Sequence, residues 1–217
     1  MLQSPDTRLA PRAYERLLAL VLSGELRPGD LVNERRLAEL LGMSRTPVRD
    51  ALLMLENEGL LERQGNRGLQ VKQMRIEDYM EALQVRMLLE PQMARMAADH
   101  ARAHDWSGLV DRLERLMAAG ADGEVERAEV REIDDRLHGL ISEAAGNRQL
   151  SGIILTLRRQ TQIFDLKSVP ERLEDTCREH LDIIARVRAG DGEGAEAAMR
   201  GHLEGVKASI IRRLGAA

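Results

Sequence analysis

The sequence contains very few aromatic residues and a single cysteine. Of its 217 residues only 2% are Phe, Trp or Tyr, while Leu, Ala, Met and Arg are abundant. This composition favours helices over a core built on a β-sheet, and the length fits one large or two small domains. The lone Cys177 has no cysteine partner for an internal disulfide, which is typical of proteins in a reducing compartment. We therefore expect a mainly α-helical protein of the cytoplasm.

The sequence also lacks a long hydrophobic segment. No apolar run approaches the roughly 20 residues that span a bilayer, and no secretory leader pattern opens the chain, so we expect no membrane partner. Residues 1–75 carry 12 Lys and Arg against 10 Asp and Glu, whereas residues 76–217 carry 20 against 26. An acidic chain is unsuited to coating DNA non-specifically, but a weak local excess of basic residues is compatible with a small DNA-contacting module.

A helix-turn-helix pattern begins at Glu34. Gly42 can adopt the left-handed conformation that ends one helix, and Ser44 can cap the backbone amides that begin the next. Apolar residues recur at helical spacing in the second helix and predict a buried stripe against the first. The stripe is Val48, Ala51, Leu52 and Leu55, and its expected partners are Leu37, Leu40 and Leu41.

Arg45 and Arg49 lie one turn apart on the opposite face of the second helix, with Thr46 between them. In DNA-binding helix-turn-helix modules the first residues of the second helix face base edges in the major groove, where arginine contacts guanine. The alternative is an ordinary solvated helix face. Two short strands, 59–63 and 68–71, surround a turn-rich segment and predict a β-hairpin, which would form a wing.

Residues 12–71 resemble the winged helix-turn-helix of the GntR family of bacterial transcription regulators. The resemblance is carried by Gly24–Asp30, by the Glu34-Arg35-x-Leu37-Ala38 motif and by the segments Gly42–Leu52, Glu58–Leu60 and Arg67–Val71; Asp50 replaces the usual Glu. It implies that the chain binds a double-stranded DNA operator. By the same resemblance the DNA-contacting residues are Arg35, Arg45, Thr46, Arg49, Arg67 and Gly68.

The chain beyond Asp78 has the pattern of about six helices and contains a group of inward-facing histidines. Asp134 and His138 share one helix face at i, i+4 spacing, in reach of one ion, while His180 and His202 lie beside apolar stripes of two later helices. A shared metal would satisfy three imidazoles that are costly to bury without partners. The alternative for each histidine is a hydrogen-bonded core residue. His100 and His104 form a second i, i+4 pair without an inward carboxylate, so we expect a structural or surface role for them.

Residues 78–210 resemble the FCD ligand-binding domain of the FadR-like branch of this family, through Asp134-x-x-x-His138, Glu179-His180 and Met199-x-x-His202. Leu137 replaces the usual phenylalanine, which could reshape the pocket. The resemblance implies that Asp134, His138, His180 and His202 coordinate one divalent metal ion per subunit: zinc, nickel, manganese or iron. It also implies a small carboxylate effector, with Arg86 as its basic partner, although Arg86 and Glu90 could equally form a plain helix pair.

From these observations we expect a homodimeric transcription regulator that responds to a metabolite and binds an inverted-repeat operator. We expect a repressor rather than an activator. We expect a winged helix-turn-helix domain at 8–74 and an all-helical effector and metal-binding domain at 78–214. One alternative is a metal-dependent hydrolase, for which His104-Asp105 offers a familiar doublet but no second His-Asp pair and no convincing general base, so we expect no enzyme. The other is a regulator whose helical domain only dimerises.

Overall fold

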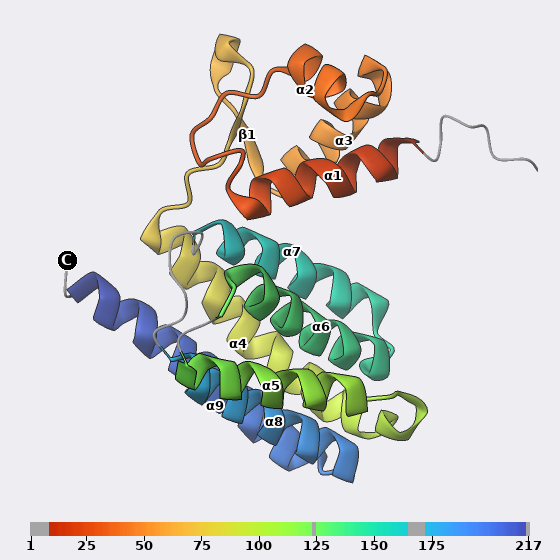
Figure 1. Cartoon of the computed structure of the whole chain (residues 1–217), viewed down its shortest axis with the longest axis vertical. Helices are drawn as coiled ribbons and strands as arrows, with labels where there is room; N and C mark the ends of the chain where they lie inside the picture. Colours follow the sequence, from red (N-terminus) through yellow and green to blue (C-terminus); the bar gives the residue numbers. More distant parts are fainter. Residues whose placement is uncertain (1–8, 123–124, 165–171, 216–217) are drawn as a thin grey trace, which may run out of the picture. The chain divides into compact units, whose positions relative to one another are not determined.

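The computed structural model describes residues 9–122, 125–164 and 172–215, so residue 8 of the expected DNA-binding domain lies outside the described residues. The described residues form nine α-helices and one two-stranded sheet (Figure 1). They divide into two compact units, each described by itself. The first holds residues 9–79 and 158–164, and the second holds residues 80–157 and 172–215. The expected fold class, a winged helix-turn-helix followed by an all-helical domain, is confirmed.

The first unit is built on α1 (Leu9–Ser23), α2 (Glu34–Leu41) and α3 (Arg45–Asn57). Both α1 and α2 pack against α3, and the expected stripe of α3 is buried in the core that they share. Leu40 was wrongly expected in this core, since it is 60% exposed. Each residue turns a helix by about 100°, so the face formed by Leu37, Ala38 and Leu41 leaves Leu40 pointing away from it.

The turn between α2 and α3 forms largely as its residues predict. Gly42 adopts the left-handed conformation, with a φ of 64°, and its backbone N–H donates to the carbonyl oxygens of Ala38 and Glu39. Ser44 is the N-cap residue of α3, but its side chain makes no capping hydrogen bond, so this expectation was wrong. The capping side chain belongs to Asn33, whose Oδ1 accepts from the backbone N–H of Arg36 at 3.0 Å and so begins α2.

A β-hairpin follows α3, as expected for a wing. Its strands β1 (Leu61–Arg63) and β2 (Leu69–Val71) are antiparallel, with Leu61 opposite Val71. A short 3₁₀ turn, η2 (Gly65–Arg67), joins them, and Gly68 has a φ of 97°, which favours glycine. Arg63 at the end of β1 donates two hydrogen bonds to Glu56 of α3, at 3.0 and 2.8 Å, and so ties the hairpin to the helix.

The second unit consists of helices whose inward faces are apolar. Its elements are α4 (Ile76–Ala98), η3 (Ala101–Ala103), α5 (Ser107–Asp122), α6 (Arg127–Ala145), α7 (Arg148–Phe164), α8 (Leu173–Ala189) and α9 (Gly192–Gly215), of which α4 and α7 extend into the first unit. Helix α8 packs along α9 and α5, and α5 packs on α6. The apolar stripes of α6 and α8 are buried. His138 of α6 and His180 of α8 are buried with them and so lie at interior positions. In the described part of the chain, no helix has both the length and the apolar character to cross a bilayer.

Candidate functional site

The first two turns of α3 present the predicted DNA-contacting side chains of that helix to solvent. Arg45, Thr46 and Arg49 are exposed there, and the two arginine side chains keep 61% and 59% of their accessible surface. Arg35 of α2 is also exposed, and Arg67 lies exposed in the hairpin turn next to the partly buried Gly68. These positions are accessible to a DNA backbone, while their contacts to DNA stay predictions.

Glu34, the first residue of α2, bridges the two arginines of α3. Its Oε1 accepts from Arg45 Nε at 2.7 Å, and its Oε2 accepts from Arg49 Nε at 3.0 Å. A further hydrogen bond joins Arg49 Nη2 to Oε1 at 3.2 Å. The hydrogen bond from Arg49 holds the pKa of Glu34 below its usual range, against the opposing effect of burial, and Arg45 adds to the lowering. Helical spacing could not reveal this bridge, because its members lie on two helices.

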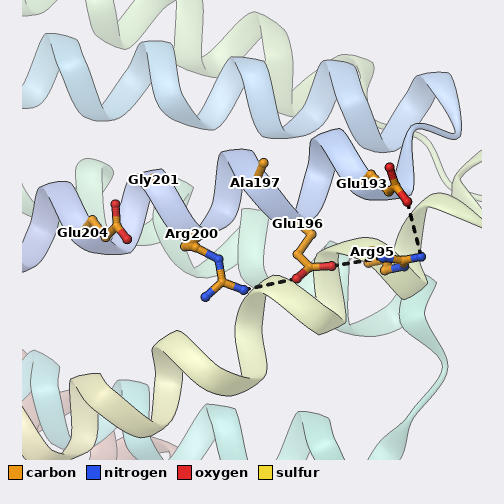
Figure 2. Close-up of a pocket in the computed structure, with 7 residues that line it drawn as sticks. All are labelled: Arg95, Glu193, Glu196, Ala197, Arg200, Gly201 and Glu204. Atoms are coloured by element: carbon orange, nitrogen blue, oxygen red, sulfur yellow. Dashed lines mark hydrogen bonds and ion pairs between the residues drawn. The ribbon is translucent and has the colours of Figure 1, made fainter.

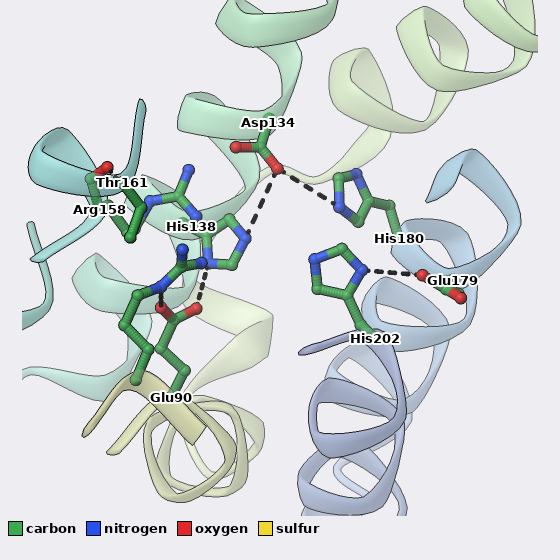
Figure 3. A network of polar contacts seen from close by, with 9 residues as sticks. Glu90, Asp134, His138, Arg158, Thr161, Glu179, His180 and His202 are labelled. Atoms are coloured by element: carbon green, nitrogen blue, oxygen red, sulfur yellow. Dashed lines mark hydrogen bonds and ion pairs between the residues drawn. The ribbon is translucent and has the colours of Figure 1, made fainter. Parts of the chain in front are cut away.

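The second unit brings together the four residues that the sequence proposes as metal ligands. Asp134 and His138 come from α6, His180 from α8 and His202 from α9, and one ligand atom of each lies within 4.8 Å of all the others. The three imidazoles are buried, while Asp134 is partly exposed. Asp134 Oδ1 lies 3.7 Å from His138 Nε2 and 3.5 Å from His180 Nε2 (Figure 3). Three imidazole nitrogens and one carboxylate oxygen in this arrangement fit a divalent transition metal.

Two glutamates contact histidines of this cluster, Glu179 through a hydrogen bond and Glu90 as a close ion-pair neighbour. His138 Nδ1 lies 2.8 Å from Glu90 Oε2, and His202 Nδ1 lies 2.9 Å from Glu179 Oε2 (Figure 3). A neutral imidazole that donates its Nδ1 hydrogen to a carboxylate keeps the lone pair of Nε2 for a metal, and the carboxylate raises the basicity of that nitrogen. Neither glutamate was predicted from the sequence to have this role. The adjacency of Glu179 to His180 was the only available signal.

Glu179 is itself held by Arg172, the residue before α8. Their side chains form an ion pair, and the guanidinium of Arg172 covers Gly205 of α9 so closely that a Cβ there would lie 2.5 Å from Nη2. Burial tends to raise the pKa of Glu179, but hydrogen bonds from His202 and Arg172 outweigh it and leave that pKa below its ordinary value. A chain of contacts therefore runs from Arg172 through Glu179 to a proposed metal ligand.

Arg86, the expected effector partner, forms the helix pair with Glu90 that the sequence left as its alternative. Arg86 Nε donates to Glu90 Oε1 at 2.5 Å, and both residues are buried. The other oxygen of Glu90 contacts His138, so Arg86 belongs to the same polar network as the proposed metal ligands. Burial makes this pair different from the exposed i, i+4 pairs of ordinary helices.

Two other candidates do not form sites in the described residues. His100 and His104 take no part in the cluster of possible metal ligands. A hollow between α4 and α9 is lined by charged side chains that pair with each other, because Arg95 and Arg200 both contact Glu196 (Figure 2). Two arginines and three glutamates line the hollow, and both arginines are used in these ion pairs, so it offers no positive group to attract an anionic ligand.

Comparison with known proteins agrees with both units. Residues 9–71 match the family described as bacterial regulatory proteins, gntR family, and residues 81–205 match the FCD domain. The chain is 33% identical over 215 residues to the HTH-type transcriptional regulator LutR of Bacillus subtilis, covering 87% of this chain and 94% of LutR. It is 28% identical over 215 residues to the HTH-type transcriptional repressor RspR of Escherichia coli, covering 95% of this chain and 91% of RspR.

Solved structures show the same fold. The structure of E. coli McbR/YncC superimposes with a TM-score of 0.79 at 23% identity, over 95% of this chain and 98% of that one. The family matches and the named relatives point to gene regulation and not to catalysis, which removes the hydrolase alternative. The chain therefore belongs to the GntR family and carries an FCD domain, and it is a DNA-binding transcription regulator, not an enzyme.

Proposed function

We propose that this regulator is a homodimer that binds an inverted-repeat operator and releases it when a small carboxylate binds near a metal ion. The DNA contacts would come from Arg35, Arg45, Thr46, Arg49, Arg67 and Gly68. The proposal on DNA is supported by the exposure of the arginines in the first two turns of α3, because readers of the major groove of this type place their contacts at the N-terminal end of the second helix. A repressor is favoured because RspR carries that name.

The convergence of four ligand atoms within 4.8 Å is the observation that carries the effector half of the proposal. Asp134, His138, His180 and His202 would hold one divalent ion, with zinc, nickel, manganese and iron all compatible with these donors. Such an ion would offer open positions to the oxygens of a carboxylate. Glu90 and Glu179 keep the rings oriented, and Arg86 places a positive charge in the same network, suited to an anionic effector.

Two-fold symmetry would give the homodimer two winged domains for two operator half-sites. Val85 and Leu88, one turn apart on α4, are 40% and 74% exposed, and exposed apolar side chains of this size support a self-association surface. We place the DNA-binding domain at 8–74 and the effector domain at 78–214, boundaries supported by the family matches at 9–71 and 81–205. Effector binding would shift the population of dimers that can bind both half-sites.

The test combines elemental analysis with ligand screening on the purified full chain. We expect about one equivalent of a divalent metal per subunit and a higher melting temperature with one class among hydroxy acids, sugar acids and dicarboxylates. The same acid should weaken binding to duplexes that the protein enriches from a random library. A chain that takes up none of the four metals and responds to no carboxylate would favour the alternative in which the helical domain only dimerises.

A further inference from the structure

The bridge formed by Glu34 differs from an ordinary surface ion pair because it joins three charged side chains. One carboxylate engages two guanidinium groups that lie one helical turn apart on α3, and all three hydrogen bonds are 3.2 Å or shorter. Its contact with Arg45 uses Nε and leaves the two terminal nitrogens of that arginine outside the bridge. Guanine recognition requires these terminal nitrogens, or one of them with Nε, in a fixed orientation.

We propose that Glu34 is a positioning residue that sets the sequence selectivity of the DNA-binding surface. It holds Arg45 and Arg49 in one arrangement before DNA arrives and cancels part of their charge. This inference rests on the proposed role of the two arginines in binding an operator.

The bridge can restrain both arginine side chains before DNA binds. An unrestrained arginine loses side-chain entropy when it binds, and restraint in the bound geometry removes that cost. Glu34 can impose this restraint because it is fixed itself: it begins α2, whose N-terminus favours a negative charge, and only 22% of its side chain is exposed. A restrained pair of arginines favours base sequences that fit its orientation over sequences that do not.

The bridge also lowers the positive charge of the DNA-binding surface. Attraction of arginines to phosphates is independent of sequence and contributes most of the affinity for random DNA. A carboxylate next to two guanidinium groups lowers the local positive charge from two to one. Glu34 therefore weakens binding to any DNA while it leaves both terminal nitrogens of Arg45 available for a base, and both effects raise the ratio of specific to non-specific affinity.

Glu34→Gln tests the inference, because glutamine has the same size without the charge. The matched control is Glu56→Gln, because Glu56 accepts two hydrogen bonds from Arg63. The side chains of Arg63 and Glu56 are 58% and 22% exposed, close to the 59% and 22% of Arg49 and Glu34. Both variants remove one negative charge from the same unit. The probes are a duplex enriched by the wild-type full chain from a random library and a scrambled duplex of equal length.

We expect Glu34→Gln to bind the scrambled duplex more tightly, with a salt dependence steeper by about one phosphate contact. Its discrimination between the two duplexes should fall by about tenfold or more, within the range that one bidentate base contact supplies. Glu56→Gln should keep its discrimination within about twofold of wild type. Glu34→Asp, which keeps the charge but shortens the side chain, should lose discrimination without gaining affinity for the scrambled duplex.

Several results would overturn the inference. Unchanged discrimination in Glu34→Gln would do so, as would an equal loss in Glu56→Gln, since that would reveal a general effect of charge. A merely structural role predicts parallel losses on both duplexes together with a lower melting temperature in Glu34→Gln and Glu34→Asp. A wild-type chain that enriches no sequence would contradict the proposed operator binding, and the inference with it. If the wild type does enrich a sequence, the variants test the role of Glu34 separately from operator binding.

Discussion

The two units of this regulator keep their candidate functional side chains in opposite environments. The side chains of Arg45 and Arg49 retain about 60% of their accessible surface, whereas His138, His180 and His202 retain 2 to 5% of theirs. A DNA-binding surface must exchange water for a large polyanion and therefore stays open. A site for a small ligand gains strength and selectivity from exclusion of water, so its polar groups need partners inside the fold.

This difference in exposure predicts which property of the protein a mutation at each site will change. Loss of an exposed arginine should remove a proposed contact to DNA and leave the fold almost unchanged, because exposed ion pairs contribute little to stability. Loss of a buried histidine leaves a carboxylate or a neighbouring ring without a partner inside a helical core. Mutations at the two sites should therefore separate DNA binding from metal binding.

The largest expected effect comes from His180→Ala. Removal of one of the four proposed ligands should abolish stoichiometric metal content, as measured by elemental analysis of the purified chain, while operator binding without effector persists. His100→Ala is the matched control, because His100 lies outside the cluster and should keep full metal content. Full occupancy in His180→Ala would show that the four residues do not form the site.

A smaller effect is expected from Glu179→Gln. The substitution weakens the hydrogen bond that orients His202 and should lower metal affinity by roughly 10- to 100-fold without eliminating binding. Competition with a chelating dye measures the change. Glu174→Gln is a suitable control, since Glu174 pairs with the exposed Arg178 on the same helix. If both variants bind metal as the wild type does, Glu179 has no orienting role.

Arg45→Ala tests the exposed DNA-binding surface of the first unit. If Arg45 reads a base, affinity for the enriched operator should fall by roughly 5- to 150-fold, the equivalent of one good base contact. Fluorescence anisotropy measures the loss, and metal content should not change. Arg27→Ala, an exposed arginine in the turn after α1, should bind the operator as the wild type does. Unchanged affinity in Arg45→Ala would contradict its assignment.

The smallest expected effect concerns the N-cap residues of α2 and α3 in the DNA-binding unit. Asn33→Ala removes a capping hydrogen bond and should lower the free energy of unfolding by about 1 kcal/mol, whereas Ser44→Ala should change it by much less. Urea denaturation followed by circular dichroism measures both. Equal losses would mean that Ser44 caps α3 in solution. Addition of a chelator should leave the difference between these two variants unchanged, because neither residue contacts the metal cluster.

The sequence predicted what depends on local spacing. Gly42 identified the turn of the DNA-binding motif, and the i, i+4 spacing of Asp134 and His138 placed both on one helix face. Contacts between helices were harder to predict: nothing in the spacing within α2 or α3 indicates that Glu34 bridges two arginines. Leu40 was misplaced for a related reason, since hydrophobicity alone does not tell which side of a short helix meets its neighbour.

The same limit applies to the metal site. Histidines on three helices could be listed as inward-facing, and the family resemblance joined them into one set, but only the fold gives the distances between their ligand atoms. The orienting glutamates escaped prediction because Glu90 and His138 lie on different helices, far apart in sequence. Local rules thus identify candidate ligands, and tertiary packing decides which side chains support them.

Gly205 illustrates how a residue without a side chain can influence chemistry that it never touches. A methyl group at this position would occupy the space of the Arg172 guanidinium, which is flexible enough to move aside without unfolding the helix. Once displaced, the arginine would no longer restrain Glu179, and the ring of His202 would gain rotational freedom. Gly205→Ala would raise the helix propensity of α9. The same substitution would loosen the orientation of His202, one of the proposed metal ligands.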